Sequence, residues 1–180
     1  LIRTFDMSND LIYNYIVAEN NSTISTDKYV KLWKIGGTNE NWDAEVYSRI
    51  GYIGGCHLKV QKTSTNQAAG IGISHNPTSG VNPDKFLNVN YILSTFSNSY
   101  VYAWANAADA SAYAHYNAND IFEMKYDNLY VRYYHNGTEI KSINVGAGLT
   151  FYLHIPLLNW SNGDIILLDW LPTSTTTSIE

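Results

Sequence analysis

The sequence predicts an all-β domain built as a two-sheet antiparallel β-sandwich, a jelly roll. Three observations lead to this prediction. Fifteen Tyr and five Trp accompany abundant Asn, Ser and Thr, whereas the helix-forming residues Glu and Lys are sparse. Short runs of alternating hydrophobic and polar residues recur from end to end, and segments rich in Gly, Asn, Ser and Asp separate them. A single domain with this many short strands needs two packed sheets.

Twelve runs are candidate strands. In chain order they are Tyr29–Ile35, Ala44–Ile50, Cys56–Gln61, Ala69–Ser74, Leu87–Thr95, Ser99–Ala105, Ala112–Tyr116, Asp120–Tyr126, Leu129–His135, Thr138–Ile143, Thr150–Ile155 and Gly163–Leu168. The stretch Asn9–Glu19 fits a short helix or a strand about equally. We expect one domain over residues 1–172 and a polar tail or linker over residues 173–180, which is rich in Thr and Ser.

Length and charge limit the class of protein. The chain has 180 residues, enough for one substantial core, and its net charge is -5 with the 11 basic residues scattered. That charge argues against a nucleic-acid partner, and no apolar run is long enough for membrane insertion. The single cysteine, Cys56, follows two glycines and is expected to be a small apolar filler of the core. Because the chain begins with Leu and shows no signal peptide, we expect an excised domain of a longer protein.

The clearest local unit is a hairpin. Hydrophobic and polar residues alternate over Leu129–His135, and the Asn136-Gly137 pair that follows is typical of a type I′ turn. Val131 and Tyr133 are expected to face the core, and the residues between them to face solvent or a partner. The hairpin therefore indicates the fold and leaves the ligand open.

Four motifs, in order, resemble a known family. They are Gly70-Ile-Gly-Ile-Ser-His-Asn-Pro77, Val101-Tyr-Ala-Trp104, Asp120-Ile-Phe-Glu-Met-Lys-Tyr-Asp127 and Val131-Arg-Tyr-Tyr-His-Asn-Gly137. Together they resemble the concanavalin A-like (laminin G/SPRY-like) jelly-roll domains, especially those of phage tail fibres and viral surface proteins. The resemblance covers about residues 45–170. Asn128 stands where that family usually has Gly, and residues 106–111 form an Ala-rich loop where a shorter polar turn is usual.

Independent physical roles can be given to several of these residues. Gly70 and Gly72 leave one strand face without side chains, so a neighbour can approach closely. Asp120 can bond nearby backbone amides, and Asp127-Asn128 suits a tight turn.

Catalytic and metal-binding patterns are weak. Glycoside hydrolases share this fold and need two carboxyls about 5–5.5 Å apart when they retain configuration. Asp43 and Glu45 have the spacing for one strand face, but no third carboxylate follows, and a polar strand edge is favoured. The five His are widely separated and are expected at surfaces or turns, and no cofactor is expected. A calcium site at the rim, with Asp109, Asp120 and Asp127 as ligands, is left as an alternative. Hydrogen-bonding roles in turns are favoured for these residues.

Aromatic residues next to Asn-rich loops are the best candidates for binding. Tyr100, Tyr102 and Trp104 alternate with Val101, Ala103 and Ala105, so the Tyr-Tyr-Trp stripe faces either core or solvent. Large aromatics usually bury, which favours the core. If the stripe faces outward, it adjoins a polar loop and suits sugar stacking. The predicted ligand-binding residues are Trp42, Tyr102, Trp104, Asn106, Asp109 and Trp160.

The resemblance and these residues together predict non-catalytic recognition. We expect a domain that binds a host receptor or a glycan, at the virion surface or otherwise outside the cell, within a homo-oligomeric fibre, for which a trimer is one option. One alternative is a structural assembly domain of a fibre or capsid. Another is a glycoside hydrolase of the same fold that uses Asp43 and Glu45.

Overall fold

The computed structural model describes residues 16–19, 22–25, 30–78, 82–159, 164–173 and 178–179. These residues form strands joined by turns, with one short 3-10 helix, η1 (Lys85–Asn88). The strands are β1 (Ile16–Glu19), β2 (Ser22–Ser25), β3 (Val30–Lys34), β4 (Ala44–Ser48), β5 (Gly51–Ile53), β6 (Cys56–Lys62), β7 (Ala69–Ser74), β8 (Tyr91–Thr95), β9 (Tyr100–Ala105), β10 (Ala108–His115), β11 (Ile121–Tyr126), β12 (Tyr130–His135), β13 (Thr138–Asn144), β14 (Thr150–Leu157), β15 (Ile165–Pro172) and β16 (Ser178–Ile179).

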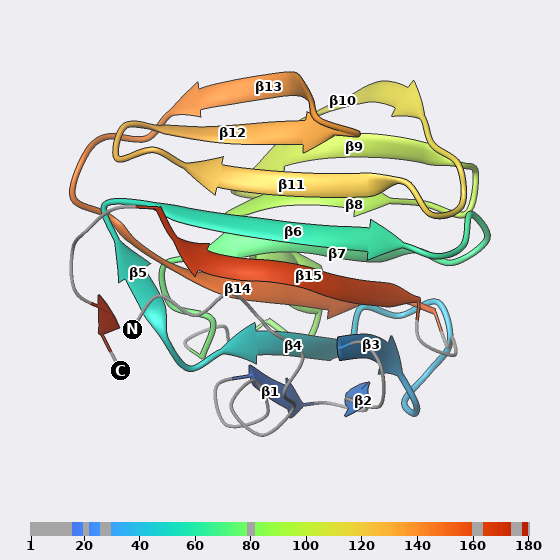
Figure 1. The fold of residues 1–180 in the computed structure, drawn as a ribbon. Coiled ribbons are helices and arrows are strands. Elements are labelled where there is room, and N and C mark those ends of the chain that lie inside the picture. Colours follow the sequence, from blue (N-terminus) through green and yellow to red (C-terminus); the bar gives the residue numbers. More distant parts are fainter. Residues whose placement is uncertain are drawn as a thin grey trace.

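Two antiparallel sheets pack face to face (Figure 1), which confirms the predicted fold class. The nine-stranded sheet has the order β1-β4-β14-β7-β8-β9-β10, with β5 paired to β14 and β16 paired to β5. The seven-stranded sheet has the order β13-β12-β11-β6-β15-β3-β2. Neighbours such as β4 and β14 are far apart in sequence, so the sheets depend on long-range pairing.

The inner faces of the two sheets form one hydrophobic core. Alternate residues of the central strands enter it, as in β6, where Cys56, Leu58 and Val60 are buried between half-exposed neighbours. Cys56 is an apolar filler as predicted, and burial raises the pKa of its thiol to about 12. Val131 and Tyr133 on β12 are also fully buried, so the prediction that they face the core is confirmed.

Most of the predicted strands are confirmed within one or two residues, and Ala69–Ser74 matches β7 at both ends. Three predictions differ by more. β15 runs to Pro172, four residues beyond the predicted strand end at Leu168. Residues 87 and 88 lie in η1 because Asp84 caps that turn, its carboxylate accepting a hydrogen bond from the Phe86 amide at 3.1 Å. Most of the predicted loop at residues 106–111 is strand, because the turn at Asn106 and Ala107 is so short that β10 begins at residue 108.

The turn predictions are confirmed. Asn136 and Gly137 have φ of 47° and 79°, as a type I′ turn requires. Asn128 has φ of 72°, and the Asp127 carboxylate accepts hydrogen bonds from the amides of Leu129 and Tyr130.

Both ends of the chain are described only in part. Residues 16–19 of the ambiguous Asn9–Glu19 stretch form strand β1, and the rest of that stretch lies outside the described residues. Within the predicted tail, Ser178 and Ile179 pair with β5. The boundary at residue 172 stays a prediction.

Candidate functional site

The outer face of the nine-stranded sheet carries the side chains that alternate with the core residues. On β4, β14, β7, β8 and β9 they are Glu45, Tyr47, Tyr152, His154, Pro156, Gly70, Gly72, Ser74, Ile92, Ser94, Tyr100, Tyr102 and Trp104. Strand register places Tyr47, His154, Gly72, Ile92 and Trp104 in one row across five strands. The row joins residues from distant parts of the sequence.

A covering segment, residues 84–90, lies on the middle of this face. A Cβ added to Gly72 would be 2.5 Å from Cγ1 of Val89, and one added to Gly70 would be 2.3 Å from Cδ1 of Ile92. The two glycines therefore allow close approach, as predicted. The segment also reaches the loop before β4, where the Lys85 amide donates a hydrogen bond to the Trp42 carbonyl at 2.6 Å. The middle of the face is filled.

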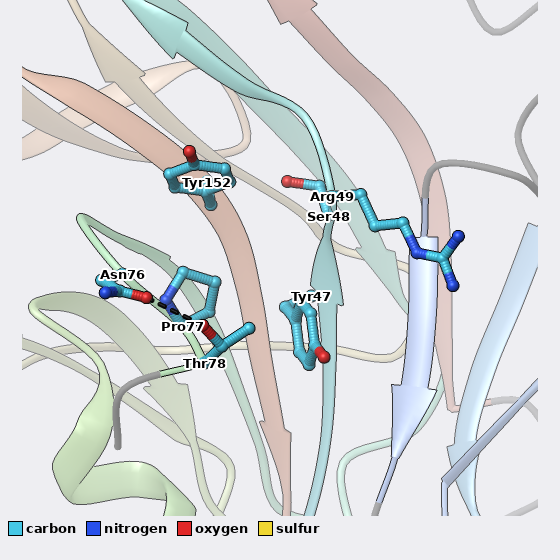
Figure 2. Close-up of a pocket in the computed structure, with 7 residues that line it drawn as sticks. All are labelled: Tyr47, Ser48, Arg49, Asn76, Pro77, Thr78 and Tyr152. Carbon is cyan, nitrogen blue, oxygen red and sulfur yellow. Dashed lines mark hydrogen bonds between the residues drawn. The ribbon is translucent and has the colours of Figure 1, made fainter. Parts of the chain in front are cut away.

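Beside this segment lies an open pocket with a volume of about 370 Å³. Its walls come from the end of β4, from β14 and from the loop after β7, and they comprise Tyr47, Ser48, Arg49, Asn76, Pro77, Thr78 and Tyr152. Figure 2 shows the rings of Tyr47, Tyr152 and Pro77 around the opening. Aromatic and proline rings next to amide and hydroxyl groups make an amphipathic lining.

Two neighbours fix the positions of the aromatic walls. The ring of Tyr152 lies directly against Gly51, where an added Cβ would be 2.6 Å from Cζ of the ring. The ring of Tyr47 meets the imidazole of His154 edge to face, with 6.5 Å between centroids. Any side chain at position 51 would therefore displace the Tyr152 ring, and a change at His154 would remove support from Tyr47.

A buried polar network lies beside Tyr47 on the same sheet face. Nδ1 of His154 is 2.9 Å from the Ser74 hydroxyl, and its Nε2 is 2.8 Å from a Glu45 carboxylate oxygen. Lys85 lies 3.4 Å from the other oxygen of Glu45. Burial alone would raise the pKa of Glu45, but the hydrogen bond and charge of His154, together with Lys85, hold it below its ordinary value. The expectation that every His lies at a surface or turn is wrong for His154, which is fully buried.

The serine, histidine and glutamate of this network do not have the geometry of an accessible nucleophile. Ser74 is fully buried, and its hydroxyl lies within 3.4 Å of the Asn90 amide under the covering segment. A reacting serine needs an open position in front of its oxygen. The arrangement supports the pocket wall from the side.

The predicted carboxylate pair is divided between two structural roles. Asp43 lies one residue before β4 and forms an ion pair with the buried ammonium of Lys34, which also donates to the carbonyls of Thr38, Asn41 and Leu158. Glu45 is committed to His154. Asp43 is outside the strand, so the two residues do not share a strand face.

The predicted aromatic stripe faces outward. Val101 and Ala103 are fully buried in the core, whereas Tyr100, Tyr102 and Trp104 are half-buried on the outer face. The arrangement with the stripe in the core, which the size of the aromatics favoured, is therefore wrong. The alternation alone was compatible with both arrangements.

Packing explains why this orientation is stable. Trp104 packs edge to face on Phe86 of the covering segment at 5.3 Å and donates from Nε1 to the Ser94 hydroxyl at 2.7 Å. Trp42 lies 5.0 Å from the same Phe86 ring and 6.2 Å from Phe96, which in turn contacts Tyr102 at 5.4 Å. The covering segment thus buries part of the stripe, and Trp42 and Trp104 act as packing residues.

The structure describes the remaining predicted ligand residues only in part. Asn106 sits in the β9–β10 turn, where its side-chain oxygen accepts from Asn90 Nδ2 at 3.2 Å. Only the backbone of Asp109, in β10, is described, and Trp160 lies outside the described residues. Sequence reasoning missed Tyr47 and Tyr152 as pocket residues, since only the long-range pairing of β4 with β14 brings them together.

Other groups in the described part of the chain have structural partners. His57 contacts Glu123 at 2.6 Å, and His135 contacts Asp120, whose carboxylate also accepts from the Asn117 amide as predicted. Among the described residues no three metal-binding side chains cluster. Within the same part of the chain, no helix has the length and apolar character to cross a membrane.

Comparison with known proteins places the fold. No family model matches the sequence, and no curated protein sequence matches it. Among solved structures, a sialidase superimposes with a TM-score of 0.62 and 9% identity, over 97% of this chain but only 18% of the sialidase chain. A Bacillus subtilis protein of unknown function with a galectin-like fold gives 0.61 and 10%, over 95% of this chain and 97% of its own. The Bacillus licheniformis beta-glucanase gives 0.56 and 10%, over 95% of each chain. At these identities the similarity concerns the fold, and this chain has the jelly roll shared by lectin-like and glucanase proteins.

Proposed function

We propose that this domain binds a glycan without cleaving it, and that the sugar occupies the pocket between Tyr47 and Tyr152. The observation that carries the proposal is the pairing of these two rings with amide and hydroxyl groups around one opening of about 370 Å³. Aromatic faces stack on the C–H surfaces of sugars, while Asn76 and Thr78 supply hydrogen bonds to hydroxyl groups.

The rival functions have less support. A glycoside hydrolase would need two free carboxyls facing one opening, and among the described residues that line this pocket none is Asp or Glu. The nearest candidate, Glu45, is bound to His154 beside the Tyr47 ring. An assembly domain would use its aromatic stripe against neighbouring subunits, but Phe86 of this same chain already packs on Trp104. Non-catalytic binding therefore remains the preferred function.

The biological setting is a further part of the proposal. We place the domain in a homo-oligomeric phage or viral fibre, outside the cell, with a host-surface glycan as its partner. This setting is supported by the order of the four sequence motifs that resemble such domains. Detection of a trimeric or other closed oligomer by light scattering, for the protein expressed with its neighbouring sequence, would test it.

A glycan array tests the binding function. The 180-residue chain is expected to bind a limited set of glycans, and Tyr47→Ala and Tyr152→Ala are each expected to weaken that binding about tenfold through loss of ring stacking. Tyr134→Ala is the matched control, because this tyrosine lies on the outer face of the other sheet, where Lys125 stands over its ring. Equal binding by wild type and both pocket variants would contradict the proposal, as would release of reducing sugar from a bound glycan.

A further inference from the structure

We infer that the pocket recognises the end of an uncharged glycan chain and admits no interior segment of a long chain. This inference rests on the proposed function and adds to it the class of ligand. It follows from what fills the sheet next to the pocket and from the groups that line the opening.

In the described part of the sheet, the row from Tyr47 to Trp104 is not a continuous groove. A chain that crossed the outer face from the Tyr47 side to the Trp104 side would pass over four strand spacings, or ~19 Å. It would have to lie on Gly72, yet the position beside that glycine is occupied by Val89, whose Cγ1 is within 2.5 Å of an added Cβ. The crossing is therefore closed along this row.

Further along the same face, Phe86 packs between Trp42 and Trp104, with ring separations of 5.0 and 5.3 Å. The aromatic stripe and the pocket are thus separated by packed side chains of the covering segment. A glycan chain that leaves the pocket toward Gly72 and Trp104 meets this segment, because Val89 fills the position on Gly72 and Phe86 packs on Trp104. Such a pocket fits the terminal residue of a chain.

The lining favours an uncharged sugar. Six of the seven lining residues are neutral, and the polar groups among them are hydroxyls and one amide. The exception is Arg49, whose side chain extends away from the other six in Figure 2. The net charge of -5 also disfavours an acidic ligand. Among the described lining residues Arg49 is the one cation, and its guanidinium points away from the tyrosine rings (Figure 2).

Affinity as a function of chain length and charge tests the inference. Glucose, galactose, mannose and N-acetylglucosamine, the linear hexasaccharide of each, glucuronic acid and N-acetylneuraminic acid would be titrated into the 180-residue chain by calorimetry. The best monosaccharide and its hexasaccharide are expected to agree in Kd within about threefold, because only one residue is bound. The acidic sugars are expected to bind at least about tenfold more weakly than that monosaccharide.

Separate results would overturn the inference and the function beneath it. A hexasaccharide that binds more than about tenfold tighter than its monosaccharide, and loses that gain in Tyr102→Ala, would show a groove across the face and overturn end recognition alone. Tighter binding of an acidic sugar, lost in Arg49→Ala, would overturn the uncharged class. If no sugar in the titrations and no glycan on the array binds, the proposed function fails and the inference fails with it.

Discussion

Replacement of Lys62 by Met should strongly destabilise the fold. The Lys62 ammonium is fully buried and lies 2.6 Å from a carboxylate oxygen of Asp164, which is 3% exposed. Its other hydrogen bonds go to the carbonyl and hydroxyl of Ser64. Burial lowers the pKa of Lys62 and raises that of Asp164, so desolvation opposes the charge on both. In Lys62→Met the carboxylate of Asp164 loses its counter-ion inside the protein.

Removing one partner of a buried ion pair costs about 3–5 kcal/mol. For a chain of this size that loss lowers the melting temperature by on the order of 10 °C. The raised pKa of Asp164 sets the sign of the pH effect. A carboxyl whose folded pKa lies above its unfolded value costs stability at neutral pH, and this cost disappears as pH falls below the unfolded value. The defect of Lys62→Met relative to wild type should therefore be smaller at pH 4 than at pH 7.

Urea unfolding followed by circular dichroism at both pH values measures the effect. Lys62→Met/Asp164→Leu is the matched control, because it replaces both charges by apolar groups and should recover most of the loss. A single variant that loses less than about 1 kcal/mol would refute the reasoning. A double variant whose loss of stability equals the sum of the losses in the two single variants would refute it as well.

Three further predictions concern the outer face and its loops. Gly51→Ala should weaken glycan binding about tenfold with little loss of stability, because the clash is with the distal end of the Tyr152 side chain, which can rotate away from the pocket. Calorimetry and thermal melts would measure affinity and stability, and loss of stability without loss of affinity would contradict the prediction. Because the folded pKa of Glu45 is lowered, its carboxylate stabilises the fold above the unfolded pKa, and this stabilisation is lost as pH falls through the folded pKa. Glu45→Gln should therefore cost about 2 kcal/mol of stability at pH 7 and lose less stability than wild type between pH 5 and 3, measured by urea titrations. Parallel stability profiles of the two proteins in acid would argue against this role of Glu45. Lys34→Met removes the ammonium that holds the loop carrying Trp42, so the fluorescence of Trp42 should shift to the red. The Trp42→Phe variant identifies the part of the spectrum that comes from Trp42. An unchanged spectrum would show that the loop does not depend on this ammonium.

Strands and turns were predictable because their signals are local. Alternation alone places β7 at Ala69–Ser74, and Asn136-Gly137 specifies the turn of its hairpin whatever surrounds it. The same logic failed at residues 87 and 88, because their apolar side chains belong to a segment that packs on the outside of a sheet. Periodicity reports which residues are apolar and cannot report which of two layers buries them.

The pocket depended on information that local patterns lack. Tyr47 and Tyr152 are brought onto one face by the pairing of Tyr47 with His154, two residues separated by more than half of the chain. The stripe illustrates the same limit, since the alternation of Tyr100, Tyr102 and Trp104 with small residues was read correctly, whereas the choice of face was left open with the core favoured. That choice was decided by Phe86, which packs on Trp104.

The covering segment also determines which part of the outer sheet face is exposed. Without residues 84–90, Ile92, Trp42 and Trp104 would leave an apolar patch on the outer face, where the glycines of β7 provide a flat floor. Val89 on Gly72 and Phe86 on Trp104 convert most of that floor into a second small core. The pocket beside Tyr47 stays open. The resemblance of the sheets to lectin-like and glucanase proteins therefore carries no substrate with it. The ligand must be sought from the residues that this segment leaves exposed.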